Sequence, residues 1–122
     1  VEENARFVLE SMAREIRVAN PINNTDSACP GYSSLSFQHP VNGAIEYFIS
    51  AGQIHRRVNS SDTIISNPDT TASRLSFCVS GNSSGDKRQP RVTVILQIRA
   101  NGSAPAEAID LQTTVSQRVL RD

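Results

Sequence analysis

The sequence predicts an α+β fold in which one N-terminal amphipathic helix packs on an antiparallel β-sheet. Apolar residues recur at steps of three and four through the first nineteen residues, which is the pattern of a helix with one buried face. From residue 35 onward apolar and polar residues alternate in short runs, which is typical of strands. No helical pattern separates these runs, so the strands are expected to pair antiparallel and not as parallel units with crossover helices.

The length and charge of the chain set the limits of this prediction. The sequence has 122 residues, with 12 basic and 12 acidic side chains. This length suits a single domain, which we expect to divide into a helix at 1–20, a loop at 21–34 and antiparallel strands at 35–122. The neutral balance argues against a protein that coats nucleic acid or an anionic membrane. No apolar run approaches the roughly 20 residues that span a bilayer.

The helix is predicted over residues 1–20. Acidic side chains lie in its first turns and arginines in its last turns, as the helix dipole prefers. Asn20–Pro21 should end it, because proline disfavours helical geometry at the preceding residue. No N-cap residue stands at Val1, so we expect the helix to continue from a segment that precedes this sequence. The face expected to pack on the sheet consists of Val8, Leu9, Met12 and Ile16.

The remaining residues predict a loop and then six or seven strands. Residues 21–34 are rich in Asn, Ser, Pro and Gly, which is typical of a loop. Ala51–Gly52 separates two alternating runs and indicates a hairpin. Asn67–Asp69, which contains a proline, and Asn101–Gly102 mark further turns. The expected strands lie within 35–37, 45–50, 53–58, 62–66, 75–79, 92–99 and 109–115.

Two cysteines, Cys29 and Cys78, are the only thiols of the chain. They do not form the close pairs of a zinc site or a C-x-x-C redox motif. We predict one disulfide between them, as in an exported protein, which would stabilise the fold by about 4 kcal/mol in the chain-entropy model. The alternative is two unrelated buried thiols. Four N-x-[ST] sequons, at Asn23, Asn59, Asn82 and Asn101, are common enough by chance in so Asn- and Ser-rich a chain to carry little weight.

Motifs for catalysis are weak, and the sequence does not predict an enzyme. Gly81–Gly85 matches G-x-S-x-G around Ser83, but a strand and not a helix follows it, and both histidines, His39 and His55, precede the serine. The simpler interpretation is a flexible hairpin loop. Two histidines without a third ligand make a poor metal site. We therefore expect no metal, no cofactor and no catalytic residue.

Basic residues suggest one contact surface. Arg56, Arg57, Arg88 and Arg91 could together form a basic patch that contacts DNA or a surface target weakly. Aromatic side chains that would stack on bases are missing between them. A solvated strand face is the alternative that the composition favours.

Three segments carry a resemblance to type IV pilin-like proteins. Asn4–Asn20, which ends in the Ile-Arg-Val-Ala step of Ile16–Ala19, is similar to the exposed half of the helix in minor pilins and pseudopilins. Leu111–Arg118 resembles the last strand of many such proteins, and Ala44–Val58 resembles one of their hairpins. Together these segments cover about half of the chain. The family's prepilin cleavage site and the apolar first half of its helix are not within this sequence.

The resemblance implies a pilin-like α+β fold and a function in assembly. The chain would be a non-catalytic structural subunit of an extracellular type IV pilus or type II secretion-like filament, acting as a minor pilin or pseudopilin. Its partners would be other pilin or pseudopilin subunits, and an apolar, N-terminally methylated helix segment would anchor it in the inner or cytoplasmic membrane before assembly. Motility, adhesion, DNA uptake and secretion all fit, and nothing in the sequence selects among them.

Two other functions remain open at this stage. One is a secreted adhesion or recognition module of α+β type that is unrelated to pilins and has a complete, capped helix. The other is a hydrolase that uses Ser83, which would need a histidine close to that serine in space.

Overall fold

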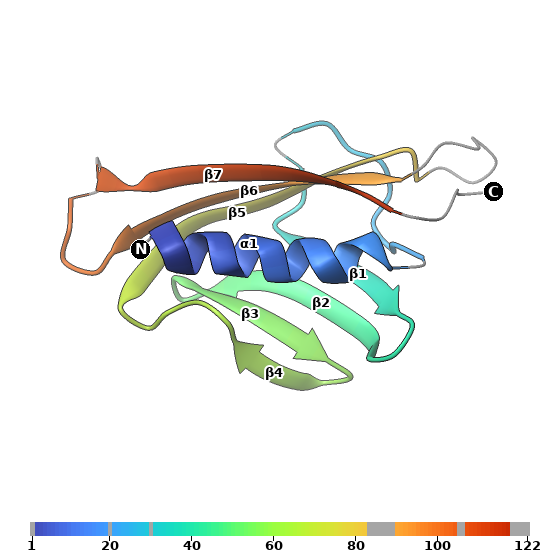
Figure 1. Cartoon of the computed structure of the whole chain (residues 1–122), viewed down its shortest axis with the longest axis horizontal. Coiled ribbons are helices and arrows are strands. Elements are labelled where there is room, and N and C mark those ends of the chain that lie inside the picture. The colour runs from blue at the N-terminus through green and yellow to red at the C-terminus, as the bar shows by residue number, and fades with distance from the viewer. Residues whose placement is uncertain (1, 20, 30, 83–89, 105–106, 118–122) are drawn as a thin grey trace.

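The computed structural model describes residues 2–19, 21–29, 31–82, 90–104 and 107–117. One helix, α1 (Glu2–Arg17), precedes the strands of two antiparallel sheets (Figure 1). The first sheet has the order β1 (Ser34–His39), β2 (Gly43–Ser50), β3 (Gln53–Val58) and β4 (Ser61–Ile64). The second sheet has the order β5 (Thr70–Ser80), β6 (Arg91–Ala100) and β7 (Ile109–Ser116).

The predicted α+β fold, a pilin-like helix on one sheet, is wrong, because the chain is mostly β and its strands form two sheets. The helix is short, with 16 residues, whereas both sheets present a row of apolar side chains on their inner faces. A helix of this length cannot cover both rows, so the sheets cover each other and α1 lies between them on one side of the molecule (Figure 1). The chain crosses from one sheet to the other after β4, in the turn around Pro68.

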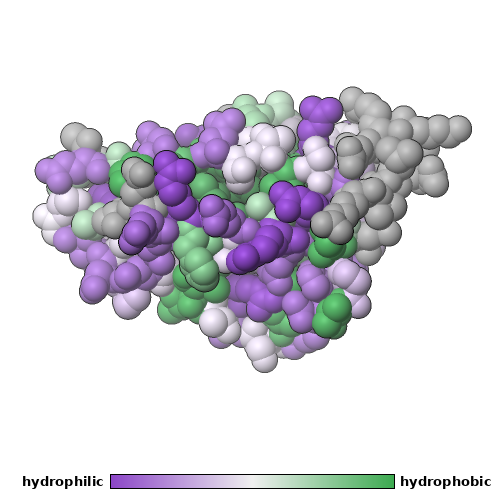
Figure 2. All heavy atoms as spheres, viewed as in Figure 1, coloured by the Kyte–Doolittle hydropathy of each residue, from purple (hydrophilic) through white to green (hydrophobic). Residues whose placement is uncertain are grey.

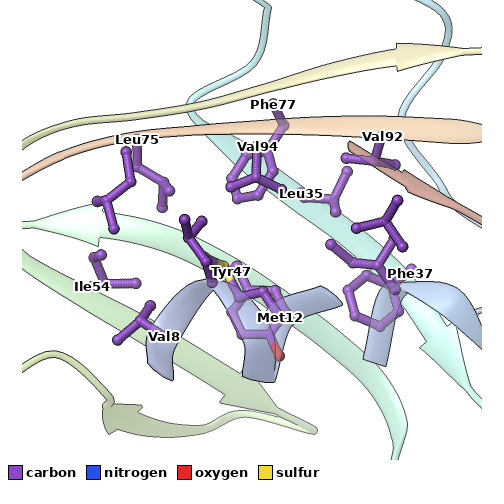
Figure 3. Packing of buried hydrophobic residues seen from close by; sticks show 14 of the residues in the cluster. Val8, Met12, Leu35, Phe37, Tyr47, Ile54, Leu75, Phe77, Val92 and Val94 are labelled. Atoms are coloured by element: carbon purple, nitrogen blue, oxygen red, sulfur yellow. The ribbon is translucent and has the colours of Figure 1, made fainter. Parts of the chain in front are cut away.

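The core lies where the two inner faces meet. Leu35, Tyr47 and Ile54 from the first sheet and Phe77 and Val94 from the second are no more than 1% exposed. Figure 3 shows Val8 and Met12 of α1 among these side chains. Alternation with period two along β1, β2 and β6 places these residues on one face and mostly polar residues on the other.

The helix buries the face that its periodicity predicts. Val8, Met12 and Ile16 are fully buried and Leu9 is 6% exposed. The helix packs most extensively against β7 and less against β6 and β1. On the other side of α1 hydrophilic side chains predominate, with smaller apolar areas between them (Figure 2). No described helix is long and apolar enough to cross a membrane.

Tight turns fix the register of the first sheet. Ala51 and Gly52 between β2 and β3, and Asn59 and Ser60 between β3 and β4, all have positive φ angles, from 48° to 80°. Two consecutive residues of this kind make the two-residue hairpin whose twist matches that of the strands. The register pairs Tyr47 with Arg56 and Phe48 with His55. This pairing determines which side chains of β2 and β3 contact each other in the candidate site.

Residues 21–29 and 31–33 form a strap that joins the two sheets. At its start Asn23 donates its backbone N–H to Ser36 of β1 (2.8 Å). Near its end Tyr32 and Phe77 of β5 exchange two backbone hydrogen bonds (2.7 and 2.8 Å). The disulfide between Cys29 and Cys78, with a Cα–Cα distance of 5.3 Å, attaches the strap covalently to β5. Gly31 passes so close to the backbone of Phe77 that a Cβ atom there would overlap it.

Removal of the disulfide should lower stability without changing the fold. We expect the double substitution Cys29→Ala and Cys78→Ala to lower the free energy of unfolding by about 2–4 kcal/mol, because the bridge closes a long loop in the unfolded chain. Urea unfolding followed by circular dichroism measures this difference. A reduced wild-type protein with the same midpoint as the oxidised one would contradict the expectation.

Candidate functional site

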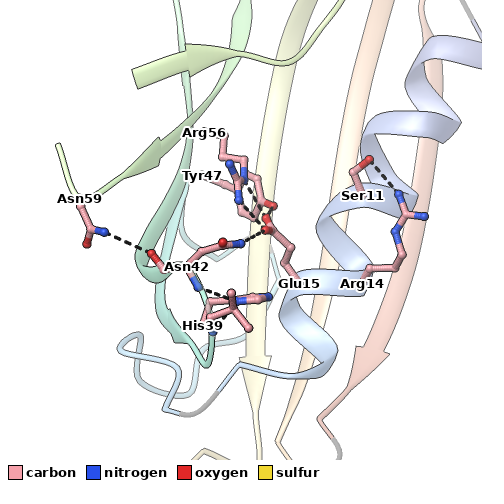
Figure 4. A network of polar contacts seen from close by, with 9 residues as sticks. Ser11, Arg14, Glu15, His39, Asn42, Tyr47, Arg56 and Asn59 are labelled. Carbon is pink, nitrogen blue, oxygen red and sulfur yellow. Dashed lines mark hydrogen bonds and ion pairs between the residues drawn. The ribbon is translucent and has the colours of Figure 1, made fainter. Parts of the chain in front are cut away.

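The most connected polar site joins α1 to the first sheet. Glu15 of α1 accepts two hydrogen bonds from Arg56 of β3, from Nε (2.9 Å) and from Nη2 (2.6 Å). The hydroxyl of Tyr47 on β2 donates to the same carboxylate, and the Asn42 side chain donates to it at 3.4 Å. Figure 4 shows the Glu15 side chain extending from the helix into this group. We call Glu15, Tyr47, Arg56 and Asn42 the Glu15 network.

Local structure brings these side chains together. Arg56 lies between Ile54 and Val58 on β3 and therefore points to the inner face of the sheet. Because Tyr47 is the register partner of Arg56, both side chains meet the helix at the same level. Glu15 borders the buried face of α1, next to Ile16, and its side chain is 17% exposed while that of Arg56 is 28% exposed.

The ionisation of the network follows from these contacts. Burial alone would raise the pKa of Glu15, but hydrogen bonds from Arg56 and Tyr47 and the charge of Arg56 outweigh it, so this pKa lies below its ordinary value of 4.5. Burial and the bond to Glu15 raise the pKa of Tyr47. The hydrogen bond to Glu15 raises the pKa of Arg56. At neutral pH a carboxylate therefore faces one guanidinium and one neutral phenol.

This arrangement suits a structural role. An ionised carboxylate has about four lone-pair sites, and the donors from Arg56, Tyr47 and Asn42 converge on all of them. The carboxylate therefore holds the helix to the sheet and is not left free to accept a proton from a substrate. His39 supports the same corner, because its Nδ1 accepts the backbone N–H groups of Val41 and Asn42 at 3.1 Å each.

A shallow groove opens beside the network, between α1 and the first sheet. Its volume is about 360 Å³, within the range of small-ligand pockets. Phe7 stands at its edge with 59% of its surface exposed. The lining consists of Phe7, Val8, Ser11, Arg14, Glu15, Tyr47, Arg56 and Ile65.

The described arginines of the predicted basic patch, Arg56, Arg57 and Arg91, do not share one strand face. Arg56 points inward to Glu15, whereas its neighbour Arg57 points to the opposite face of the sheet and pairs with Glu46 at 3.0 Å. Arg91 lies on β6, in the second sheet. Arg88 lies outside the described residues, as does Ser83. The sequence prediction grouped arginines by nearness in the chain, while alternation along β3 separates Arg56 from Arg57.

Arg57 instead belongs to a cluster on the outer face of the first sheet. The rings of Phe48 and His55 stack with centroids 4.9 Å apart and an angle of 13°. Arg57 places its guanidinium carbon 4.6 Å from the centre of the Phe48 ring, a cation–π contact. His55 also contacts Asp62 of β4 at 3.0 Å. We call Phe48, His55, Arg57, Glu46 and Asp62 the outer-face cluster.

Residues of the described part of the chain do not form a group of three or more His, Cys, Asp or Glu side chains that could hold a metal ion. His39 and His55 serve different corners of the first sheet, each with its own partner.

The sequence prediction missed the Glu15 network, although two signals pointed to it. Glu15 lies seven residues after Val8 and borders the apolar stripe, so it could reach a partner under the helix. Arg56 alternates with two apolar residues that face inward. The sequence does not show that Glu15 and Arg56 meet. That requires the hairpin register, which places Tyr47 beside Arg56.

Comparison of the chain with known protein families, with curated proteins and with solved structures gave no match. The function is therefore argued from the residues and their geometry.

Stability should fall in acid because of Glu15. The pKa of Glu15 is lower in the folded protein than the ordinary 4.5. The contribution of its carboxylate to the free energy of unfolding is therefore complete above pH 4.5, and it is lost as the pH falls through the lower, folded-state pKa. Urea unfolding between pH 7 and pH 2.5 should show a smaller acid-side loss for Glu15→Gln than for the wild type. If the free energy of unfolding fell equally with pH in the two proteins, Glu15 would not be the source of the acid-side loss.

The pair of Glu15 and Arg56 should also show an interaction energy at neutral pH. A double-mutant cycle with Glu15→Gln and Arg56→Gln should give about 1–2 kcal/mol of coupling, less than a fully buried pair because both side chains are partly exposed. Glu46→Gln with Arg57→Gln is the matched control, because that pair is more exposed and should couple by less than about 0.5 kcal/mol. Equal coupling in the two cycles would contradict the special role of the Glu15 network.

Proposed function

We propose that this chain is the extracellular part of a non-catalytic structural subunit, with α1 as a rigid stem. The function that fits best is that of a minor pilin or pseudopilin in the assembly of a type IV pilus or type II secretion-like filament. The proposal concerns the role of the subunit and not a pilin fold, since the two-sheet architecture differs from the one that the resemblance implies.

The observation that carries the proposal is the attachment of α1 along its whole length. Near its start Asn4 accepts a hydrogen bond from the backbone N–H of Asn67 at 3.0 Å. In its last turns Glu15 is bound by Arg56 and Tyr47, and just beyond it Ala19 accepts a bond from Gln117. The face between these points is buried. A helix held in this way transmits the position of its N-terminal end to the whole domain.

Two further features support a subunit that works outside the cytoplasm. The disulfide between Cys29 and Cys78 forms and persists in oxidising compartments. The segment Asn4–Asn20, most of which lies in α1, is similar in sequence to the helix of minor pilins and pseudopilins. In the Glu15 network the carboxylate accepts four hydrogen bonds, which attach the proposed stem, α1, to the first sheet.

The coding sequence upstream of Val1 tests the proposal at the lowest cost. A filament subunit of this kind should have a short basic leader followed by about 20 apolar residues that run directly into α1. A cleavable signal peptide with no apolar helix after it would contradict the proposal.

Deletion of the gene tests the function itself. We expect loss or reduction of filaments, scored together with DNA uptake and protein secretion, and restoration by the wild-type gene. Complementation with Glu15→Ala should restore less filament than Glu46→Ala at equal protein level, because only the first loosens the stem. Full filament production in the deletion strain would contradict a role in assembly.

The outer-face cluster favours a second candidate, a secreted recognition module. The Phe48 ring, covered by His55 and Arg57, with Glu46 and Asp62 at its rim, offers aromatic and charged groups on one face of the first sheet. Under this alternative Phe48→Ala should abolish adhesion of the purified domain to its target surface while leaving the fold intact. Under the filament proposal the same substitution should leave filament assembly unchanged.

A further inference from the structure

The edges of the two sheets differ in how they are protected. An unprotected edge strand exposes backbone N–H and C=O groups that can pair with another chain, and proteins usually cover such edges. The strap covers the free edge of β1, where Asn23 donates to Ser36 (2.8 Å) and Gln38 donates to Pro21 (3.0 Å). It also covers the free edge of β5, through Tyr32 and through the bond from Ser27 to Val79 (2.8 Å). In the second sheet β7 lies beside α1.

The free edge of β4 has no such cover from the residues that the structure describes. β4 ends the strand order of the first sheet, and all of its residues are exposed. Ile64 in particular leaves 53% of its surface exposed, among the highest values for a large apolar residue of the described chain. Asp62, two residues before Ile64, is the only charged residue of the strand.

The hydrogen-bond pattern shows which backbone groups point away from β3. Ile65 donates its N–H to Ile54 of β3 at 2.9 Å, so this opposed pair is hydrogen-bonded. In an antiparallel ladder hydrogen-bonded and non-hydrogen-bonded pairs alternate. Continuing the register to Thr63 opposite Arg56 places Asp62 and Ile64 in non-hydrogen-bonded pairs. The N–H and C=O groups of Asp62 and Ile64 therefore face the open edge.

We propose that two copies of this chain pair through β4, antiparallel about a two-fold axis, so that their first sheets become one continuous sheet. A second copy is the occupant that β4 itself specifies. Only one antiparallel register uses both outward-facing residues of both strands, with Asp62 of each copy opposite Ile64 of the other. This register forms four backbone hydrogen bonds and places the two Thr63 residues next to each other on the axis.

Charge and side-chain contacts agree with the same register. It avoids placing one Asp62 directly opposite the other, which would be destabilising. Each Asp62 already contacts His55 of its own copy and is the register partner of Arg57, so its charge is partly compensated. Each exposed Ile64 gains a neighbouring strand, and threonine pairs across strands are favourable.

The contact is short, and this sets its strength. β4 has four residues, and short edge strands that carry a charge are one way in which proteins limit association. We therefore expect weak self-association of the isolated domain, with a dissociation constant on the order of 0.1–1 mM, as for small transient interfaces. This inference is independent of the filament proposal, and the failure of one leaves the other standing.

A cysteine at the two-fold axis gives the sharpest test. Both native cysteines are in the disulfide, so Thr63→Cys would add the single free thiol. In the proposed register the two positions form a non-hydrogen-bonded pair with Cα atoms about 4.5 Å apart, within the range of disulfides. Mild oxidation should therefore convert most of this variant to a covalent dimer. The matched control, Thr114→Cys, places an exposed thiol on β7 and should give at least fivefold less dimer.

A second pair of variants tests the backbone hydrogen bonds. Ile64→Pro removes an N–H that points away from β3, so the sheet of the single copy should persist, whereas self-association measured by sedimentation should weaken at least tenfold. Ile64→Thr keeps this N–H, so it should weaken self-association by less than Ile64→Pro does. Comparable dimer from Thr114→Cys, or no self-association of the wild type at 1 mM, would overturn the proposal.

Discussion

The structure depends on one constraint, which is that a single short helix cannot cover the apolar inner faces of two sheets. The 16 residues of α1 cover only part of the inner faces, so the sheets pack against each other and the helix closes the side between them (Figure 1). Between the helix and the first strand, the strap hydrogen-bonds to an edge strand of each sheet and so ties the two sheets together. The disulfide holds the strap where it meets β5.

The Glu15 network is the polar counterpart of that apolar packing. Apolar contacts are non-directional, so they alone would tolerate sliding or rotation of α1 between the sheets. A carboxylate bound by two nitrogens of one guanidinium and by a buried phenol has a defined geometry. It therefore fixes the position of the helix against β2 and β3, as the stem role that we propose for α1 requires.

The local elements could be predicted from the sequence, whereas their assembly could not. Periodicity predicts the buried face of α1, and Ala51–Gly52 predicts the hairpin that the φ angles of both residues show. The number of sheets could not be predicted, because alternation along a strand gives its buried face but not the partner of that face. The same limit explains the arginines: neighbours in the chain, Arg56 and Arg57, serve opposite faces of one strand, and only the hairpin register shows that Arg56 meets Tyr47.

We infer that α1 and both sheets form one cooperative unit, because the helix is fixed to the sheets by polar contacts as well as by apolar packing. Native-state amide hydrogen exchange of the wild-type protein measures this directly, because it gives an opening free energy for each backbone amide. In one cooperative unit, the central amides of α1, around Met12, open with the same free energy as those of β2 and β6, and this free energy equals that of global unfolding. An opening free energy for α1 that is lower than that of the strands by more than about 1.5 kcal/mol would show a helix that detaches by itself, and would contradict a single cooperative unit.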